Sequence, residues 1–276
     1  MFDVHVHAGP CVVERAADDL DTVATYEAAG FDGCVLKGHC EPTVGRAAAA
    51  GKGRDLAVHG GIVLNATVGG FNPVAVAAAL SMGGRVVWLP TVDARAHHAS
   101  GLDHPPSCAP ALPRGPGYAA PPVDPSGTAA LRTVFGLIAD ADAVLATGHL
   151  GADETAWVVA EARRCGVRRL LLTHPSFTVP GLSAAATREL TDQGAVAEIT
   201  AYQWLHQAGM DASTLAAFIR AVGYPHCLLS SDVGQPTSPS APQALADLIE
   251  ALTAEGLDRG ALRAMASEIP ATLVTP

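Results

Sequence analysis

Two histidines near the start of the chain have the spacing of a metal site. His5 and His7 lie two residues apart in an apolar run, Phe2–His7. Because side chains alternate along a β-strand, both imidazoles are expected to leave the same face, with Asp3 one step behind them. Imidazole nitrogens are common ligands of zinc and related divalent ions. An H-x-H pair is a weak signal alone, so its meaning depends on ligands elsewhere.

Three more ligand-type side chains follow apolar runs later in the chain. His149, His174 and Asp232 each come directly after a short run rich in apolar residues. Each of these residue types is also common in turns and at helix N-termini. Their coincidence at the ends of three separate runs, with His5 and His7 at the end of a fourth, favours one shared site if the runs are parallel strands.

The apolar runs recur at the intervals expected of a parallel barrel. Eight of them are bounded by turn residues and are predicted strands: Phe2–His7, Gly33–Lys37, Leu56–Leu64, Arg85–Leu89, Ala143–Thr147, Arg169–Thr173, Ala195–Thr200 and Cys227–Ser231. Segments with helical spacing separate most of them: Asp19–Ala29, Pro73–Ser81, Thr128–Ala139, Ala152–Cys165, Ser183–Gln193 and Ser213–Val222. This alternation predicts a single-domain (β/α)8 TIM barrel over residues 1–276. An open doubly wound sheet is the alternative, and the lack of a G-x-G-x-x-G loop after any strand disfavours it.

The interval Pro90–Ser126 breaks the alternation. It is rich in proline and shows no helix or strand pattern. Long irregular segments inside compact domains are often functional. Because this one follows the fourth predicted strand, we expect a lid over the carboxyl ends of the strands that contributes to the pocket.

Composition limits the function classes. The 276 residues are 49% hydrophobic and 16% charged, with a net charge of −10, which excludes a disordered chain and argues against nucleic acid or an anionic membrane as partner. No apolar run is long enough to span a membrane, and the N-terminus shows no targeting segment, so a cytoplasmic protein with reduced cysteines is expected. The sequence leaves a homo-oligomer open.

In order and strand position, the candidate ligands resemble those of the amidohydrolase superfamily. That family has an H-x-H on the first strand, histidines after the fifth and sixth, and an aspartate after the eighth. Its members are metal-dependent (β/α)8 enzymes, and this chain resembles the smaller ones, which lack a flanking β-sandwich. The resemblance implies one or two divalent ions, with zinc as the first choice and manganese or iron as alternatives, bound by His5, His7, His149, His174 and Asp232.

One lysine departs from the family's pattern. Binuclear members often carry a carbamylated lysine on the fourth strand, where this chain has none. Instead Lys37 ends the apolar second strand, where a lysine is costly to desolvate unless it is paired or modified. As a carbamate Lys37 would bridge two metal ions. As an ammonium it would pair with a carboxylate or hold a substrate oxyanion, so the number of ions stays open.

Further residues near the ends of the strands or inside the expected lid are candidates for substrate binding: His39, Asn65 and Trp88, with His97 and His98 in the lid. His39 lies two residues beyond Lys37, and Asn65 ends the third strand. Glu198 is an acid within the apolar seventh strand, so it is expected either to be paired inside the barrel or to belong to the site.

Together these features predict a metal-dependent hydrolase of a small molecule. Activated water would attack an amide, lactam, lactone or related ester, with Asp232 as the proton acceptor. His174 would bind a second ion or stabilise the oxyanion. A decarboxylase or isomerase using the same metal site is the alternative, favoured by one ion and an unmodified Lys37. A barrel that only binds a metal or ligand is disfavoured by the complete ligand set.

Overall fold

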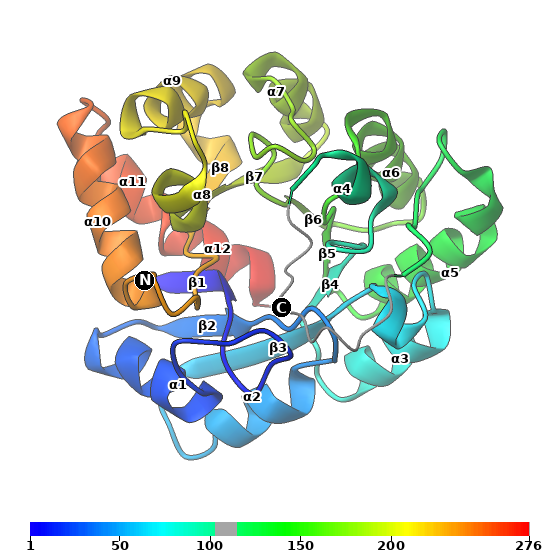
Figure 1. Cartoon of the computed structure of the whole chain (residues 1–276), viewed down its shortest axis with the longest axis horizontal. Coiled ribbons are helices and arrows are strands. Elements are labelled where there is room, and N and C mark those ends of the chain that lie inside the picture. The colour runs from blue at the N-terminus through cyan, green and yellow to red at the C-terminus, as the bar shows by residue number, and fades with distance from the viewer. Residues whose placement is uncertain (103–114, 276) are drawn as a thin grey trace.

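Eight parallel strands form the centre of the computed structural model, which describes residues 1–102 and 115–275 (Figure 1). The strands are β1 (Phe2–Val6), β2 (Gly33–Leu36), β3 (Ala57–Val63), β4 (Val86–Trp88), β5 (Val144–Ala146), β6 (Arg169–Leu172), β7 (Ala195–Thr200) and β8 (Cys227–Ser230). Each pairs in parallel with the next in sequence order. The predicted (β/α)8 barrel is therefore confirmed.

Helices surround the strands, as Figure 1 shows. They are α1 (Asp19–Ala28), α2 (Val44–Ala50), α3 (Pro73–Ser81), α4 (Arg95–Ala99), α5 (Thr128–Asp140), α6 (Ala152–Arg164), α7 (Ala184–Asp192), α8 (Ala201–His206), α9 (Ala212–Val222), α10 (Ala241–Ala254), α11 (Arg259–Met265) and α12 (Glu268–Val274), with 3-10 turns η1 (Ala66–Val68), η2 (Pro125–Gly127) and η3 (Tyr224–His226). The described helices include none with the length and apolar character needed to cross a bilayer.

The hydrophobic core has an inner and an outer part. Inward side chains such as Val35, Val63 and Trp88 fill the barrel, and Leu273 and Val274 of α12 pack against them. Two larger clusters lie between the strands and the surrounding helices. With the barrel packed and α12 against it, the open space for a site is at the carboxyl ends of the strands.

The barrel closes where β1 meets β8, at the residues that carry the candidate ligands. The Asp232 N–H donates to the His5 carbonyl oxygen over 2.7 Å, and the His7 N–H donates to the Val233 oxygen over 2.9 Å. These main-chain bonds fix both ligand-bearing segments relative to each other.

A register shift in β1 corrects the expected position of Asp3. The shift lies between Asp3 and Val6, and it places the consecutive residues Val4 and His5 both toward the barrel interior. Alternation therefore fails here, because a bulge adds a residue to one strand. The Asp3 carboxylate faces the seam instead, where Oδ1 accepts from the His5 and Ser231 N–H groups, each at 3.1 Å.

Asp3→Ala is expected to destabilise the fold by about 2–4 kcal/mol, because it leaves two buried amides and the buried Tyr26 hydroxyl without their acceptor. That hydroxyl donates to Asp3 Oδ2 over 2.5 Å. Urea denaturation measures the loss, and Asp55→Ala, at an exposed bend, is the matched control with a change within about 0.5 kcal/mol. Equal stabilities for the two variants would contradict this stabilising role of the Asp3 carboxylate.

The predicted lid has more regular structure than expected. Helix α4 lies within Pro90–Ser126, and Ala94 forms a parallel bridge with Tyr118. A helix of one turn is too short to show a period in the sequence, so the expectation of no helix is wrong here. Residues 103–114 of the lid, and Cys108 and Arg114 with them, lie outside the described residues.

Candidate metal centre

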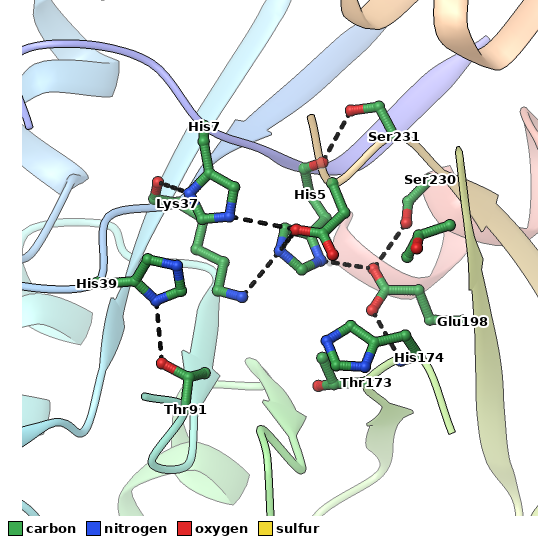
Figure 2. Close-up of polar contacts among 12 residues, drawn as sticks. His5, His7, Lys37, His39, Thr91, Thr173, His174, Glu198, Ser230 and Ser231 are labelled. Atoms are coloured by element: carbon green, nitrogen blue, oxygen red, sulfur yellow. Dashed lines mark hydrogen bonds and ion pairs between the residues drawn. The ribbon is translucent and has the colours of Figure 1, made fainter. Parts of the chain in front are cut away.

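The Nε2 atoms of two imidazoles, His5 and His7, point toward the same carboxylate oxygen of Asp232. Asp232 Oδ1 lies 2.8 Å from His5 Nε2 and 3.2 Å from His7 Nε2. All three residues are buried, and their donor atoms lie within 4.8 Å of one another. Figure 2 shows the two rings beside Lys37, at the carboxyl ends of β1 and β2. The structure thus brings together residues from opposite ends of the chain.

The remaining nitrogen of each ring faces an acceptor. His5 Nδ1 donates to Glu198 Oε1 over 2.9 Å, and His7 Nδ1 donates to the Lys37 carbonyl oxygen over 3.0 Å. Because Nδ1 carries the proton, each neutral ring has its lone pair on Nε2. A neutral ring with its lone pair toward a carboxylate oxygen is repelled by it, unless a proton or a metal ion lies between them. This donor set therefore fits a divalent cation.

The charges around His5 favour a cation at the same place. Burial lowers the pKa of His5, but the Asp232 and Glu198 carboxylates raise it to about 9. Burial raises the pKa of Glu198, yet His5 lowers it below its usual value. Glu198 also accepts from the Ser230 hydroxyl at 2.7 Å and from the His174 N–H at 3.2 Å. Of the two outcomes expected for Glu198, the structure shows the paired one.

Backbone strain gathers at the ends of β6 and β8. His174 has φ = 27° and Asp232 has φ = 52°, in the region that non-glycine residues rarely adopt. Within residues 1–102 and 115–275, Asp142 is the one other non-glycine residue with a positive φ. Such conformations cost about 1–3 kcal/mol each and tend to gather at functional sites. The strain supports a functional role for both side chains.

Lys37 lies inside the cluster with 2% of its surface exposed. Its Nζ is 2.8 Å from His5 Nε2 and 5.6 Å from the centre of the Trp88 ring. Burial lowers the pKa of the Lys37 amine, and among the described residues no carboxylate forms an ion pair with it. The expected ammonium–carboxylate pair is therefore not what the structure shows. An uncharged amine is the form that can react with carbon dioxide.

Three more histidines lie beside this cluster. The ring centres of His149 and His174 are 5.0 Å apart, and His149 Nδ1 is 2.9 Å from His97 Nδ1 on α4. Burial lowers the pKa of His174 to about 4 and that of His149 well below its usual value. In the described part of the chain, the buried His174 Nδ1 has no hydrogen-bond partner. These neutral rings could ligate a second ion.

The cluster opens into a cavity of about 400 Å³. Its wall includes several of the predicted site residues: His7, Lys37, His39, His97, His149, His174 and Asp232. The lid contributes His97, Val92 and Leu102. Sequence reasoning missed five other wall residues, all in loops or at a helix start: Val13, Arg15, Phe177, Tyr202 and Gln235.

Three predicted substrate-binding residues do not line this cavity. Trp88 is fully buried below Lys37, as part of the barrel filling. His98 is on the outer side of α4, with Nε2 3.9 Å from Asp93 Oδ1. Asn65 is buried as well. The structure therefore places all three outside the wall of this cavity, because strand position alone does not tell which residues a lid or a neighbouring ring covers, and their contact with a substrate stays a prediction.

Asn65 instead orients His39 through Thr91. Its Nδ2 donates to the His39 carbonyl oxygen at 3.0 Å and to Thr91 Oγ1 at 2.8 Å. Thr91 Oγ1 lies 3.0 Å from His39 Nδ1 (Figure 2). Within the described residues, His39 Nδ1 is the one acceptor within reach of the buried Thr91 hydroxyl proton. That proton is therefore assigned to the bond with Nδ1, which leaves the proton of the neutral His39 ring on Nε2. Burial keeps this ring neutral, with its pKa well below the usual value.

Comparison with known proteins agrees with this architecture. Residues 1–198 match the model of a family described as a family of unknown function, DUF6282. No curated protein matches the sequence. Similar solved structures include an amidohydrolase from Pseudomonas aeruginosa, with 10% identity, a TM-score of 0.62, and 99% of this chain and 94% of that one covered.

Two other solved structures extend the likeness. One is an organophosphorus hydrolase from Deinococcus radiodurans, with 12% identity, a TM-score of 0.64, and 99% of this chain and 92% of that one covered. The other is a 2,6-dihydroxybenzoate decarboxylase, with 11% identity, a TM-score of 0.58, and coverage of 99% and 98%. The expected resemblance to the amidohydrolase superfamily is confirmed at the level of the fold.

Proposed function

We propose that this chain, which belongs to the family DUF6282, is a metal-dependent hydrolase of a small molecule. The bond cleaved is an amide, lactam, lactone or related ester. The observation that carries the proposal is the convergence of His5 Nε2 and His7 Nε2 on Asp232 Oδ1, with both Nδ1 atoms held by acceptors.

Two groups of residues would hold the metal. His5, His7 and Asp232 would bind one divalent ion, zinc as the first choice and manganese or iron as alternatives. His149, His174 and a carbamylated Lys37 would complete a second position. When bound, such an ion lowers the pKa of a coordinated water towards about 7 and polarises a substrate carbonyl.

The chain's own residues supply the proton transfer and the orientation. Asp232 Oδ1 faces the two imidazoles, whereas no hydrogen bond engages Oδ2 within the described ranges. The pKa of Asp232 lies well below its usual value, since His5 and His7 outweigh the effect of burial. Oδ2 is therefore ionised at neutral pH and can accept the proton of the attacking water, then deliver it to the leaving group. His39 Nε2–H is placed to donate to a substrate oxygen.

A decarboxylase or isomerase is the second candidate. The position of Lys37 beside His5 supports this candidate if the amine is unmodified and protonated. In that form Nζ would hold a substrate carboxylate and would not ligate a metal. The two candidates therefore differ in the state of one side chain.

Metal content and intact mass distinguish them. For a binuclear hydrolase we expect two ions per chain by elemental analysis and a native mass increment of one carbon dioxide in bicarbonate, lost on acid treatment and absent from Lys37→Met. The same preparation should open members of a panel of lactones, N-acyl amides and esters. One ion, no increment and carbon dioxide release from aromatic or β-keto acids would favour the second candidate. Failure to bind zinc, manganese or iron after reconstitution would overturn both.

A further inference from the structure

An arginine outside the predicted site lines the cavity without a partner. Arg15 lies in the loop between β1 and α1 and shares the cavity wall with His7, Lys37 and Asp232. Its Nε is buried and unbonded. Across the described residues, no hydrogen bond or ion pair engages any part of its guanidinium.

Most other arginines in the described part of the chain are held by acids or carbonyl groups. Arg46 bonds to Asp19 and Glu41, and Arg259 bonds to Glu250. A half-buried guanidinium with an unbonded Nε is unfavourable unless an acceptor reaches it. In a protein with 27 acidic residues, the described part of the chain supplies Arg15 with none. The acceptor is therefore expected to lie outside the described residues.

Main-chain hydrogen bonds hold the loop of Arg15 beside the candidate metal ligands. The Gly9 N–H donates to the Ala17 oxygen and the Asp19 N–H to the Gly9 oxygen, each over 2.8 Å, which closes the loop on itself. The Ala16 N–H donates to the Gly234 oxygen over 2.9 Å. Gly234 follows Asp232 closely in sequence and packs so tightly that a Cβ there would lie 2.0 Å from the His7 oxygen. The backbone that carries Arg15 is thus held beside both ligand-bearing segments, and the side chain reaches the cavity wall from there.

The wall around Arg15 is short of negative charge. The one acid among the described wall residues is Asp232, whose Oδ1 already faces two imidazoles. Tyr202 and Gln235 add polar groups to the same wall. This region of the cavity therefore lacks negative charge to neutralise Arg15.

We propose that Arg15 binds a carboxylate of the substrate, so that the enzyme acts on small molecules carrying an acid group beside the bond to be cleaved. A guanidinium can hold a carboxylate by two parallel hydrogen bonds, which fixes orientation as well as position. A cavity of about 400 Å³ accommodates such a small molecule. The reaction named here rests on the proposed function, whereas the binding of the acid does not.

Calorimetry with a matched pair of probes tests the binding. Tetrahydrofuran-2-carboxylate and tetrahydrofuran-2-carboxamide differ only in the acid group. Because the proposed enzyme cleaves amides and a bound ion would itself attract the acid, binding is measured on chelator-treated protein. With the wild type, the acid is expected to bind about tenfold or more tightly than the amide. In Arg15→Gln this preference should fall to about twofold or less, with Arg15→Lys between them because it keeps the charge and loses the fork.

Arg263→Gln is the control, since it removes the same charge from an exposed position on α11 and should leave the preference unchanged. Equal binding of acid and amide by the wild type, or an acid preference that persists in Arg15→Gln, would overturn the proposal. Displacement of the acid by equimolar inorganic phosphate would likewise overturn the carboxylate assignment. An acid preference in a protein that hydrolyses nothing in the panel would support Arg15 and count against the proposed hydrolase alone.

Discussion

His5→Asn is expected to remove bound metal from the purified protein and to abolish turnover with it. His5 supplies Nε2 to the site and is the ring whose Nδ1 is held by Glu198. Loss of a partner that only orients a metal-binding histidine costs about 10–100-fold in metal affinity, and loss of the histidine itself should cost more. Elemental analysis after gel filtration, together with zinc titration against a chromophoric chelator, measures both effects.

Glu198→Gln provides the graded comparison. The amide keeps an acceptor for the His5 Nδ1–H but loses the negative charge, so we expect metal affinity to fall by about 10–100-fold and the ion to remain bound at high zinc. His226→Asn is the matched control, because that residue lies on η3 at the start of β8, at the opposite end of the barrel. Metal retained at the wild-type level by His5→Asn would refute the assigned site.

Most of the fold could be predicted because its signals are local. Each strand is a short apolar run closed by turn residues, and β7 (Ala195–Thr200) begins and ends where predicted. The convergence of His5, His7 and Asp232 could also be predicted, since parallel strands bring their carboxyl ends together whatever lies between them. The short helix α4 could not, because one turn has no detectable period.

Features that depend on contacts between distant segments were not predictable. The register shift in β1 arises where Asp3 bonds to Ser231, far along the chain, and strand alternation carries no trace of it. Arg15 lies in a loop, where neither strand nor helix periodicity places a side chain. Its one signal in the sequence is position, since its loop directly follows the first predicted strand at the end where the ligands lie.

Asp232→Asn is expected to lower kcat about 10²–10⁴-fold, the contribution typical of a positioned acid–base group, while the fold persists. Asparagine is the best substitute here, because it tolerates the positive φ that Asp232 adopts and keeps an oxygen for His5 and His7. It cannot accept a proton at neutral pH, but it also removes the charge of a proposed metal ligand, so kcat is compared only between samples with equal metal content.

The measurement is kcat for the best panel substrate at saturating zinc, with metal content determined on the same sample. Asp211→Asn, at the exposed N-cap of α9, controls for the loss of one charge and should retain full activity. Unchanged kcat in Asp232→Asn would exclude Oδ2 as the proton acceptor. The Asp232→Asn variant could also lose lactone or amide hydrolysis and still release carbon dioxide from acids. That result would show that the main reaction of the site does not need activated water, and it would favour the decarboxylase over the hydrolase.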